Sequence, residues 1–261
     1  MAFLGDYHTH TIFSKKKWLP YKHGKNTFEE NVERAAELGL KEIAITDHGF
    51  NHRVYGTNIK NIHRLNEEKQ KLKEKYNLNV LSGVEANIIS TEGDIDISAD
   101  EIKNLDILVC GFHTFVKGKT FKDGFTMFCC NFFANLFKVR SKKNIEKNTK
   151  AYIKMLQKYP VDIISHLNYG IAKVDALAVA KEAVKRKTYI ELNCKRIHLT
   201  KEEVDEMVKM GVMFIVDSDA HSIDRIADFN LARKVIKDYN IPSENIANLD
   251  KLPNFKNYKR K

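Results

Sequence analysis

Short runs of apolar residues alternate along the chain with longer segments in which apolar residues recur every three or four positions. The short runs are rich in Val, Ile and Leu and show little alternation with polar residues. Parallel strands that are buried on both faces have this pattern. We therefore predict seven strands, at residues 3–7, 42–46, 80–84, 106–111, 161–165, 188–193 and 212–216.

The segments between these runs carry the start and stop signals of helices. Two of them begin at a T-x-x-E capping box and end at a glycine, namely Thr27, Glu30 and Gly39 in the first and Thr200, Glu203 and Gly211 in the second. A further helix is predicted around residues 177–184, and a last long helix runs from about residue 223 to residue 238.

Strand and helix alternate over the whole chain, which predicts an α/β fold with parallel strands. Seven strands without a glycine-rich dinucleotide-binding turn favour a barrel over a doubly wound sheet. A chain of 261 residues is an ordinary length for one such barrel. We therefore expect a single barrel domain over residues 1–261.

One segment, residues 115–143, departs from this rhythm. Its apolar residues are spaced as on one face of a helix, at Phe121, Phe125, Phe128, Phe132 and Leu136. Basic residues flank them, at Lys117, Lys119, Lys122, Lys138, Arg140, Lys142 and Lys143. We expect this helix to pack on the barrel or on a second copy of the chain. A lid over the site and a helix on a membrane surface are the alternatives.

The net charge of +10 arises from 44 Lys and Arg against 34 Asp and Glu. It suggests an anionic partner, which could be a phosphorylated metabolite, a nucleic acid or an acidic membrane surface. The sequence shows no signal peptide and no apolar stretch as long as a membrane span. The four cysteines form no C-x-x-C motif. We expect a cytoplasmic protein with no membrane partner.

Side chains that bind metal ions follow the predicted strands. Six of the seven strands end in such residues, in the order His8 and His10, Asp47 and His48, Glu85, His113, His166, and Asp219 and His221. The carboxyl ends of the strands of a parallel barrel open on one face, where such folds carry out their chemistry. His8 and His10 can approach one ion together, because residues two apart in an extended chain point to the same side.

A single histidine is usually an ordinary core or surface residue, and we expect this of His52, His63 and His198. Random placement would not put His, Asp or Glu at six strand ends. Imidazole and carboxylate are ligands for Zn²⁺, Mn²⁺ and Fe²⁺. The set exceeds the needs of one ion, so we expect two or three metals. Asp47, beside His48, is expected to orient a ligand rather than to bind metal.

The strand-end motifs together resemble those of a known family. They are His-x-His, Thr-Asp-His, Gly-Val-Glu-Ala-Asn, Gly-Phe-His, Ile-Ser-His and Ser-Asp-Ala-His, in this order. Each motif is short, but six in order over nearly the whole chain are specific. They resemble the PHP (polymerase and histidinol phosphatase) family, and the stretch at residues 83–96 is most similar to its YcdX-like phosphatase branch. Against that branch, residues 115–143 look like an insertion.

The resemblance implies a distorted (β/α)7 TIM-like barrel with a trinuclear metal site at the carboxyl ends of the strands. The ions would be Zn²⁺, with Mn²⁺ or Fe²⁺ as alternatives. The implied ligands are His8, His10, Glu85 and Asp219 for the first metal, Glu85, His113 and His166 for the second, and His48, His221 and His23 for the third.

We expect a metal-dependent phosphatase of small phosphomonoesters, in which a metal-bridged hydroxide attacks phosphorus and no protein nucleophile is needed. L-Histidinol phosphate is a candidate substrate that rests on the resemblance. Arg196, Lys195 and Arg53 follow predicted strands and are candidates for contacting the phosphate. An exonuclease or phosphodiesterase acting on nucleic acid is the alternative, although no binding domain for nucleic acid is evident. A non-catalytic metal-binding regulator is a third possibility.

Overall fold

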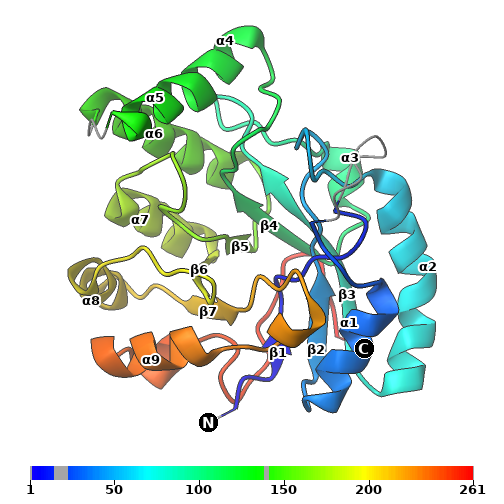
Figure 1. Cartoon of the computed structure of the whole chain (residues 1–261). Coiled ribbons are helices and arrows are strands. Elements are labelled where there is room, and N and C mark those ends of the chain that lie inside the picture. The colour runs from blue at the N-terminus through cyan, green and yellow to red at the C-terminus, as the bar shows by residue number, and fades with distance from the viewer. Residues whose placement is uncertain (1, 15–22, 138–140, 261) are drawn as a thin grey trace.

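The computed structural model describes residues 2–14, 23–137 and 141–260. Its seven strands pair in chain order, and each is parallel to the next. They are β1 (Gly5–Asp6), β2 (Glu42–Ile45), β3 (Asn79–Asn87), β4 (Ile107–Gly111), β5 (Ile163–Ile164), β6 (Tyr189–Asn193) and β7 (Phe214–Asp217). Each overlaps a predicted strand, although β3 begins earlier and ends later than predicted and β7 ends one residue later. The predicted α/β barrel is confirmed, and Figure 1 shows its helices on the outside.

The helices connect successive strands and cover the barrel (Figure 1). The α-helices are α1 (Phe28–Glu37), α2 (Ile59–Tyr76), α3 (Ala99–Ile102), α4 (Phe121–Gly124), α5 (Cys130–Leu136), α6 (Lys142–Lys158), α7 (Ala176–Arg186), α8 (Lys201–Lys209) and α9 (Asn230–Tyr239). A π-helical turn, Phe125–Cys129, joins α4 to α5, and two 3₁₀ turns occupy Ile223–Arg225 and Ser243–Asn245.

Both predicted capping boxes are present. The Thr27 side chain accepts a hydrogen bond from the Glu30 backbone, the Glu30 side chain accepts one in return, and Thr200 and α8 repeat the arrangement. The expectation of one helix over 223–238 was wrong at its start, because α9 begins at Asn230. Ala227 has a positive φ of 57° and donates its backbone N–H to Asp6, so the chain turns there instead of continuing as a helix.

The barrel closes between β7 and β1 through side chains as well as backbone. Asn248 is fully buried; its Oδ1 accepts from the Val216 N–H at 3.1 Å and its Nδ2 donates to the Gly5 carbonyl at 3.0 Å. Just beyond the strands, Thr9 and Ala220 form a parallel bridge. These contacts satisfy backbone groups that a full ladder would otherwise pair.

The end of the barrel opposite the strand-end histidines is closed by the C-terminal segment. Phe255 packs edge-on against Tyr7, with ring centroids 4.9 Å apart, and both belong to the apolar cluster inside the barrel. Arg260 pairs with the buried Glu42 at 2.7 Å. One end of the barrel is thus sealed, which leaves the other end as the place for polar chemistry.

The helix predicted within 115–143 forms, but only Phe128 of its apolar row packs on the barrel, where it stacks on Phe112. Packing on a second copy of the chain, the other expectation, stays a prediction. Phe121 is 93% exposed, and Phe125, Phe132 and Leu136 are each more than half exposed. The π-helical turn interrupts the regular spacing, and Met127 takes the buried position instead. Within the described residues, no helix is long and apolar enough to cross a membrane.

Replacing Phe255 by Ala should lower the free energy of unfolding by about 3 kcal/mol, because it opens a cavity beneath Tyr7. Urea denaturation followed by circular dichroism measures this change. The control is Phe121→Ala, which removes a ring that is 93% exposed and should change stability by less than about 0.5 kcal/mol. Equal effects of the two substitutions would contradict the proposed role of the C-terminal segment.

Candidate metal centre

Glu85, at the carboxyl end of β3, lies at the centre of a group of histidines. It is fully buried. Its Oε1 is 2.9 Å from His166 Nε2 and 3.1 Å from His113 Nε2, and its Oε2 is 2.8 Å from His48 Nδ1. Four strands therefore bring their ends to one carboxylate, and its two oxygens face different imidazoles. Such a carboxylate is placed to bridge two cations.

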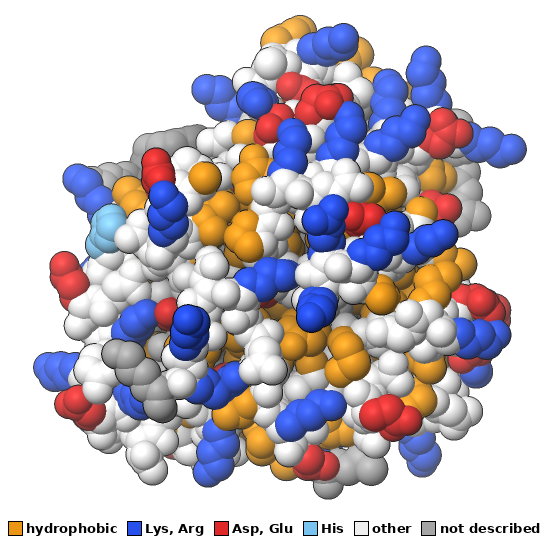
Figure 2. Space-filling view, turned by 180° about the vertical axis from the view of Figure 1, so that it is seen from behind, with side chains coloured by type: hydrophobic (Ala, Val, Ile, Leu, Met, Phe, Trp, Pro, Cys, Tyr) orange, Lys and Arg blue, Asp and Glu red, His pale blue; other side chains and the backbone are white. Residues whose placement is uncertain are grey.

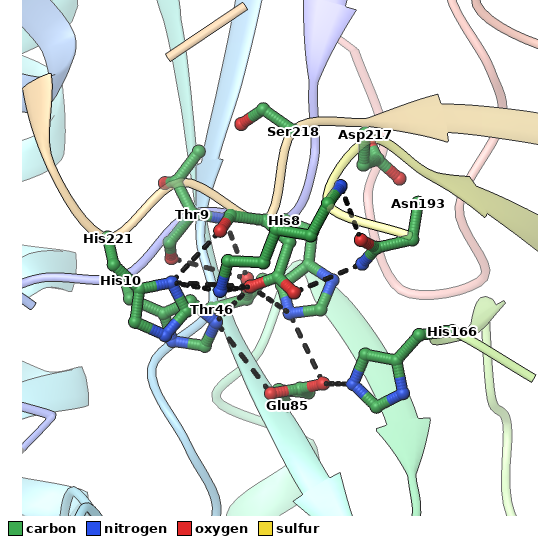
Figure 3. Close-up of polar contacts among 12 residues, drawn as sticks. His8, Thr9, His10, Thr46, Glu85, His166, Asn193, Asp217, Ser218 and His221 are labelled. Carbon is green, nitrogen blue, oxygen red and sulfur yellow. Dashed lines mark hydrogen bonds and ion pairs between the residues drawn. The ribbon is translucent and has the colours of Figure 1, made fainter. Parts of the chain in front are cut away.

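His8 and His10, just after β1, point to the same side of the chain, as their spacing predicts. His8 Nε2 lies 3.2 Å from Glu85 Oε1, and His10 Nε2 lies 3.3 Å from Asp219 Oδ1. Figure 3 shows these side chains converging with those of Glu85 and His166 from different strands. His8, His10 and Glu85 offer ligand atoms within 4.8 Å of one another.

A second concentration of imidazoles lies beside the first. His10, His48 and His221 offer nitrogens within 4.8 Å of one another, and the rings of His10 and His221 are 4.2 Å apart. The His23 ring is 4.1 Å from that of His221 and stacks on Tyr55 at 3.8 Å. His23 therefore lies where a further ligand from the loop after β1 was expected.

Two of these residues have an unusual backbone conformation. His166 has a φ of 28° and Asp219 a φ of 52°, in the left-handed region that side chains other than glycine rarely adopt. Such conformations cost about 1–3 kcal/mol each and occur mostly at functional sites. Here they turn each side chain toward the centre immediately after a strand ends.

Further buried residues orient the imidazoles. Glu191 Oε1 is 2.7 Å from His8 Nδ1, and Asn87 Oδ1 is 2.7 Å from His113 Nδ1. The Nε2 atoms of His8 and His113 are thereby directed toward Glu85. Sequence reasoning missed both residues. The signal for Glu191 was present, since it is the one carboxylate in the buried strand β6 and lies between Ile190 and Leu192.

Asp47 supports the site without reaching its centre. Its Oδ1 accepts hydrogen bonds from the Thr11 N–H at 2.6 Å and from Ser14 Oγ at 2.5 Å, and Ser14 Oγ lies 3.4 Å from His10 Nδ1. Asp47 therefore fixes the loop that follows His10. This geometry matches an orienting role rather than a ligand role.

Several polar atoms of the cluster are buried and form no hydrogen bond among the described residues, although three of the imidazole nitrogens approach a carboxylate oxygen at the distances given above. The buried atoms are His8 Nε2, His10 Nε2, both ring nitrogens of His48, Glu85 Oε2 and His221 Nε2. Burying a polar group without a hydrogen bond costs about 1–3 kcal/mol. A cluster of such groups is therefore not a stable arrangement by itself. Nitrogen and carboxylate donors that converge in this way fit divalent metal ions.

The electrostatics favour the protonation states that bind metal. Burial lowers the pKa of His10 and His48 well below its usual value and that of His221 to about 4. Burial alone would raise the pKa values of Glu85 and Asp219, but the surrounding histidines hold both well below their usual range. At neutral pH the site therefore offers ionised carboxylates and neutral imidazoles at His10, His48 and His221. Burial also disfavours the charged forms of His8 and His166, but the adjacent carboxylates Glu85 and Glu191 raise the pKa of both.

The centre opens into a cavity of about 430 Å³, whose walls include Arg196, Lys195 and His52. Lys195 Nζ lies 3.0 Å from Asp219 Oδ1 and 2.7 Å from His221 Nδ1, so it already contacts two expected ligands. Arg196 is exposed at the cavity wall, whereas Arg53 is exposed and does not line it. His52, expected to be incidental, is buried there, and its Nδ1 accepts from the Tyr55 N–H at 2.9 Å.

Comparison with known proteins identifies the type of domain. Residues 6–195 match the family model of the PHP domain. A relative from Caldanaerobacter subterraneus, named a probable phosphatase, is 30% identical over 98% of this chain and 92% of its own length. Another so named, from Shewanella piezotolerans, is 29% identical over 95% of this chain and 90% of its own.

A solved structure has the same fold. The histidinol phosphate phosphatase of Lactococcus lactis, in complex with zinc, L-histidinol and phosphate, superposes with a TM-score of 0.61 at 14% identity. The match covers 92% of this chain and 95% of that one. At 14% identity this similarity shows a shared barrel fold and no more than that.

Acid should destabilise the metal-free protein, and His221 should contribute. Its pKa is about 4 in the folded state and 6.5 in the unfolded state, so between these values the unfolded chain binds more protons. Stability is therefore lost as the pH falls from about 6.5 toward 4. From pH 7 to pH 5 this histidine should contribute about 2 kcal/mol of the loss.

Urea denaturation in EDTA at the two pH values, with wild type and His221→Gln, measures this contribution. The loss on acidification should be about 2 kcal/mol smaller in the variant. His63→Gln, which changes an exposed histidine on α2, should behave as wild type. An identical loss in all three proteins would show that His221 is not buried in its neutral form.

Proposed function

This chain belongs to the PHP domain family, and we propose that it is a metal-dependent phosphatase that hydrolyses small phosphomonoesters. The observation that carries the proposal is the convergence of imidazoles on the buried, ionised Glu85, with several buried ring nitrogens that form no hydrogen bond among the described residues. The phosphatase names of relatives that match nearly the whole chain support it.

We assign the residues at the centre to three ions. The first would be held by His8, His10, Glu85 and Asp219, the second by Glu85, His113 and His166, and the third by His48, His221 and His23. Zn²⁺ is the ion that we expect, since imidazole suits it and the solved histidinol phosphate phosphatase contains zinc, although Mn²⁺ or Fe²⁺ could occupy the same ligands. Lys195 would then leave Asp219 and His221 and face the cavity.

Divalent ions at this site would activate a water for attack on phosphorus and neutralise the phosphoryl oxygens. We assign no protein nucleophile to the reaction, since the activated water would be the attacking group. Glu191, Asn87 and Asp47 keep the imidazoles and the loop after β1 in position. Arg196 adds a guanidinium that can donate two hydrogen bonds to a phosphate.

The size of the cavity supports a small substrate. A volume of about 430 Å³ is typical of sites for metabolites and leaves little room for a macromolecule. Aromatic and cationic side chains, among them Tyr169, Lys173 and Arg196, line the cavity. L-Histidinol phosphate is the first substrate to test, because the solved neighbour acts on it by name.

The direct test is phosphate release from p-nitrophenyl phosphate and L-histidinol phosphate by protein loaded with Zn²⁺ or Mn²⁺. Glu85→Gln should lower kcat/KM by at least about 100-fold, since even the outer partners of metal ligands contribute 10–100-fold. Metal analysis of the same sample should show fewer ions per chain. Glu182→Gln, on the outer helix α7, is the matched control and should retain the wild-type kcat/KM and the wild-type metal content. A metal-loaded wild type that hydrolyses no phosphomonoester in a broad panel would refute the proposal.

Arg196→Ala should raise KM about tenfold and change kcat little, because it removes a charged hydrogen bond to bound phosphate worth about 1.5 kcal/mol. Arg196→Lys should restore part of the affinity. Arg186→Ala, which removes an arginine from the outer face of α7, serves as the control. A KM equal to that of wild type would show that Arg196 does not contact the phosphate of the substrate.

A further inference from the structure

The helical segment α4–α5 carries an exposed apolar surface that the phosphatase proposal does not use. We call it the apolar tip, and it consists of Phe121, Phe125, Phe132, Phe133, Leu136 and Phe137, each between 51% and 93% exposed. Together they expose about 600 Å² of apolar side chain, at the upper limit of what soluble monomers show. A surface of this kind usually marks an interaction site.

The opposite side of this helix holds it in place. Met127 is 2% exposed, and Phe128 stacks on Phe112 with ring centroids 5.2 Å apart. The buried amides of Asn131 and Asn148 exchange hydrogen bonds of 3.0 and 2.9 Å, which join the helix to α6. The apolar tip therefore points outward on a fixed support rather than folding down over the cavity as a lid.

Positive charge is concentrated around the apolar tip. Five exposed lysines among the described residues flank it in the sequence, and we call them the basic rim: Lys117, Lys119, Lys122, Lys142 and Lys143. The one acidic residue within residues 117–143 is Asp123. No acidic residue occurs from residue 124 to residue 145. Figure 2 shows a hydrophobic cap beside Lys and Arg side chains at the top of the molecule, where α4 lies in Figure 1. Apolar and cationic groups thus share one surface.

We propose that the apolar tip docks on an anionic phospholipid bilayer. Rings and Leu136 would enter the interface between headgroups and acyl chains, while the flanking lysines would face the anionic headgroups. A second copy of the chain fits less well, because a two-fold contact would bring the same basic rim against itself. Single-stranded nucleic acid is bound in grooves where bases stack on aromatic rings, whereas these rings project from a convex helix.

Docking in this way would place the bilayer beside the catalytic cavity. Asn135, on the same helix, lines that cavity, while its neighbours Leu136 and Phe137 belong to the apolar tip. One side of α5 would therefore contact lipid and another would form part of the cavity wall. The protein would lie on the membrane surface, without a helix that spans it among the described residues.

Co-sedimentation of the full chain with phosphatidylcholine vesicles, with and without phosphatidylserine, tests the proposal. Binding should require phosphatidylserine and should weaken as salt is added. The double variant Phe133→Ser/Phe137→Ser removes two stacked rings and should lower binding by about 100-fold, given the free energy of burying each ring. Leu38→Ser/Met210→Ser changes two exposed apolar residues at the ends of α1 and α8 and should bind as wild type.

Circular dichroism should be the same for all variants, which shows that they fold. Equal binding to vesicles with and without phosphatidylserine, or equal binding by both double variants, would overturn the proposal. The proposal would also be overturned if the wild type binds no vesicles and light scattering shows it to be a dimer that dissociates in Phe133→Ser/Phe137→Ser. Binding to single-stranded DNA that outcompetes the vesicles would instead identify the basic rim as a nucleic-acid surface.

Discussion

A charge buried among imidazoles is the constraint on which the rest of this structure depends. Glu85 is fully buried and ionised, at the end of the longest strand. An unpaired carboxylate in such a place would cost several kcal/mol. It is tolerated because His48, His113 and His166 approach its oxygens from three other strand ends. Those strands must therefore end at the same level, which restricts the register of the sheet around β3.

The two ends of the barrel divide stability and chemistry between them. At one end, Phe255 packs on Tyr7 and Arg260 pairs with Glu42, so apolar and ionic contacts close the interior. At the other end, buried polar atoms that form no hydrogen bond lie close together, and His166 and Asp219 adopt backbone conformations that cost free energy. Stability from the packed barrel offsets this local cost, and metal binding would offset more of it.

The helix of the 115–143 segment shows that periodicity alone does not say which way a face points. The spacing of its apolar residues is typical of a helix that packs on a core, yet most of them face outward. The π-helical turn and the Asn131–Asn148 amide pair set its rotation, so a buried polar contact holds the helix while its rings remain exposed. Amphipathic spacing identified the helix correctly, but it did not distinguish a face packed on the barrel from a face left exposed.

The sequence by itself determined the seven strands, their parallel order and the residues at their ends. Buried parallel strands leave a continuous apolar signature, and ligand-type residues that follow such runs must gather on one face of a barrel. The start of α9 and the supporting roles of Glu191 and Asn87 depend on contacts between residues far apart in the chain. Only the tertiary structure decided those, and only it showed the apolar tip, because no local pattern records which surface is left without a partner.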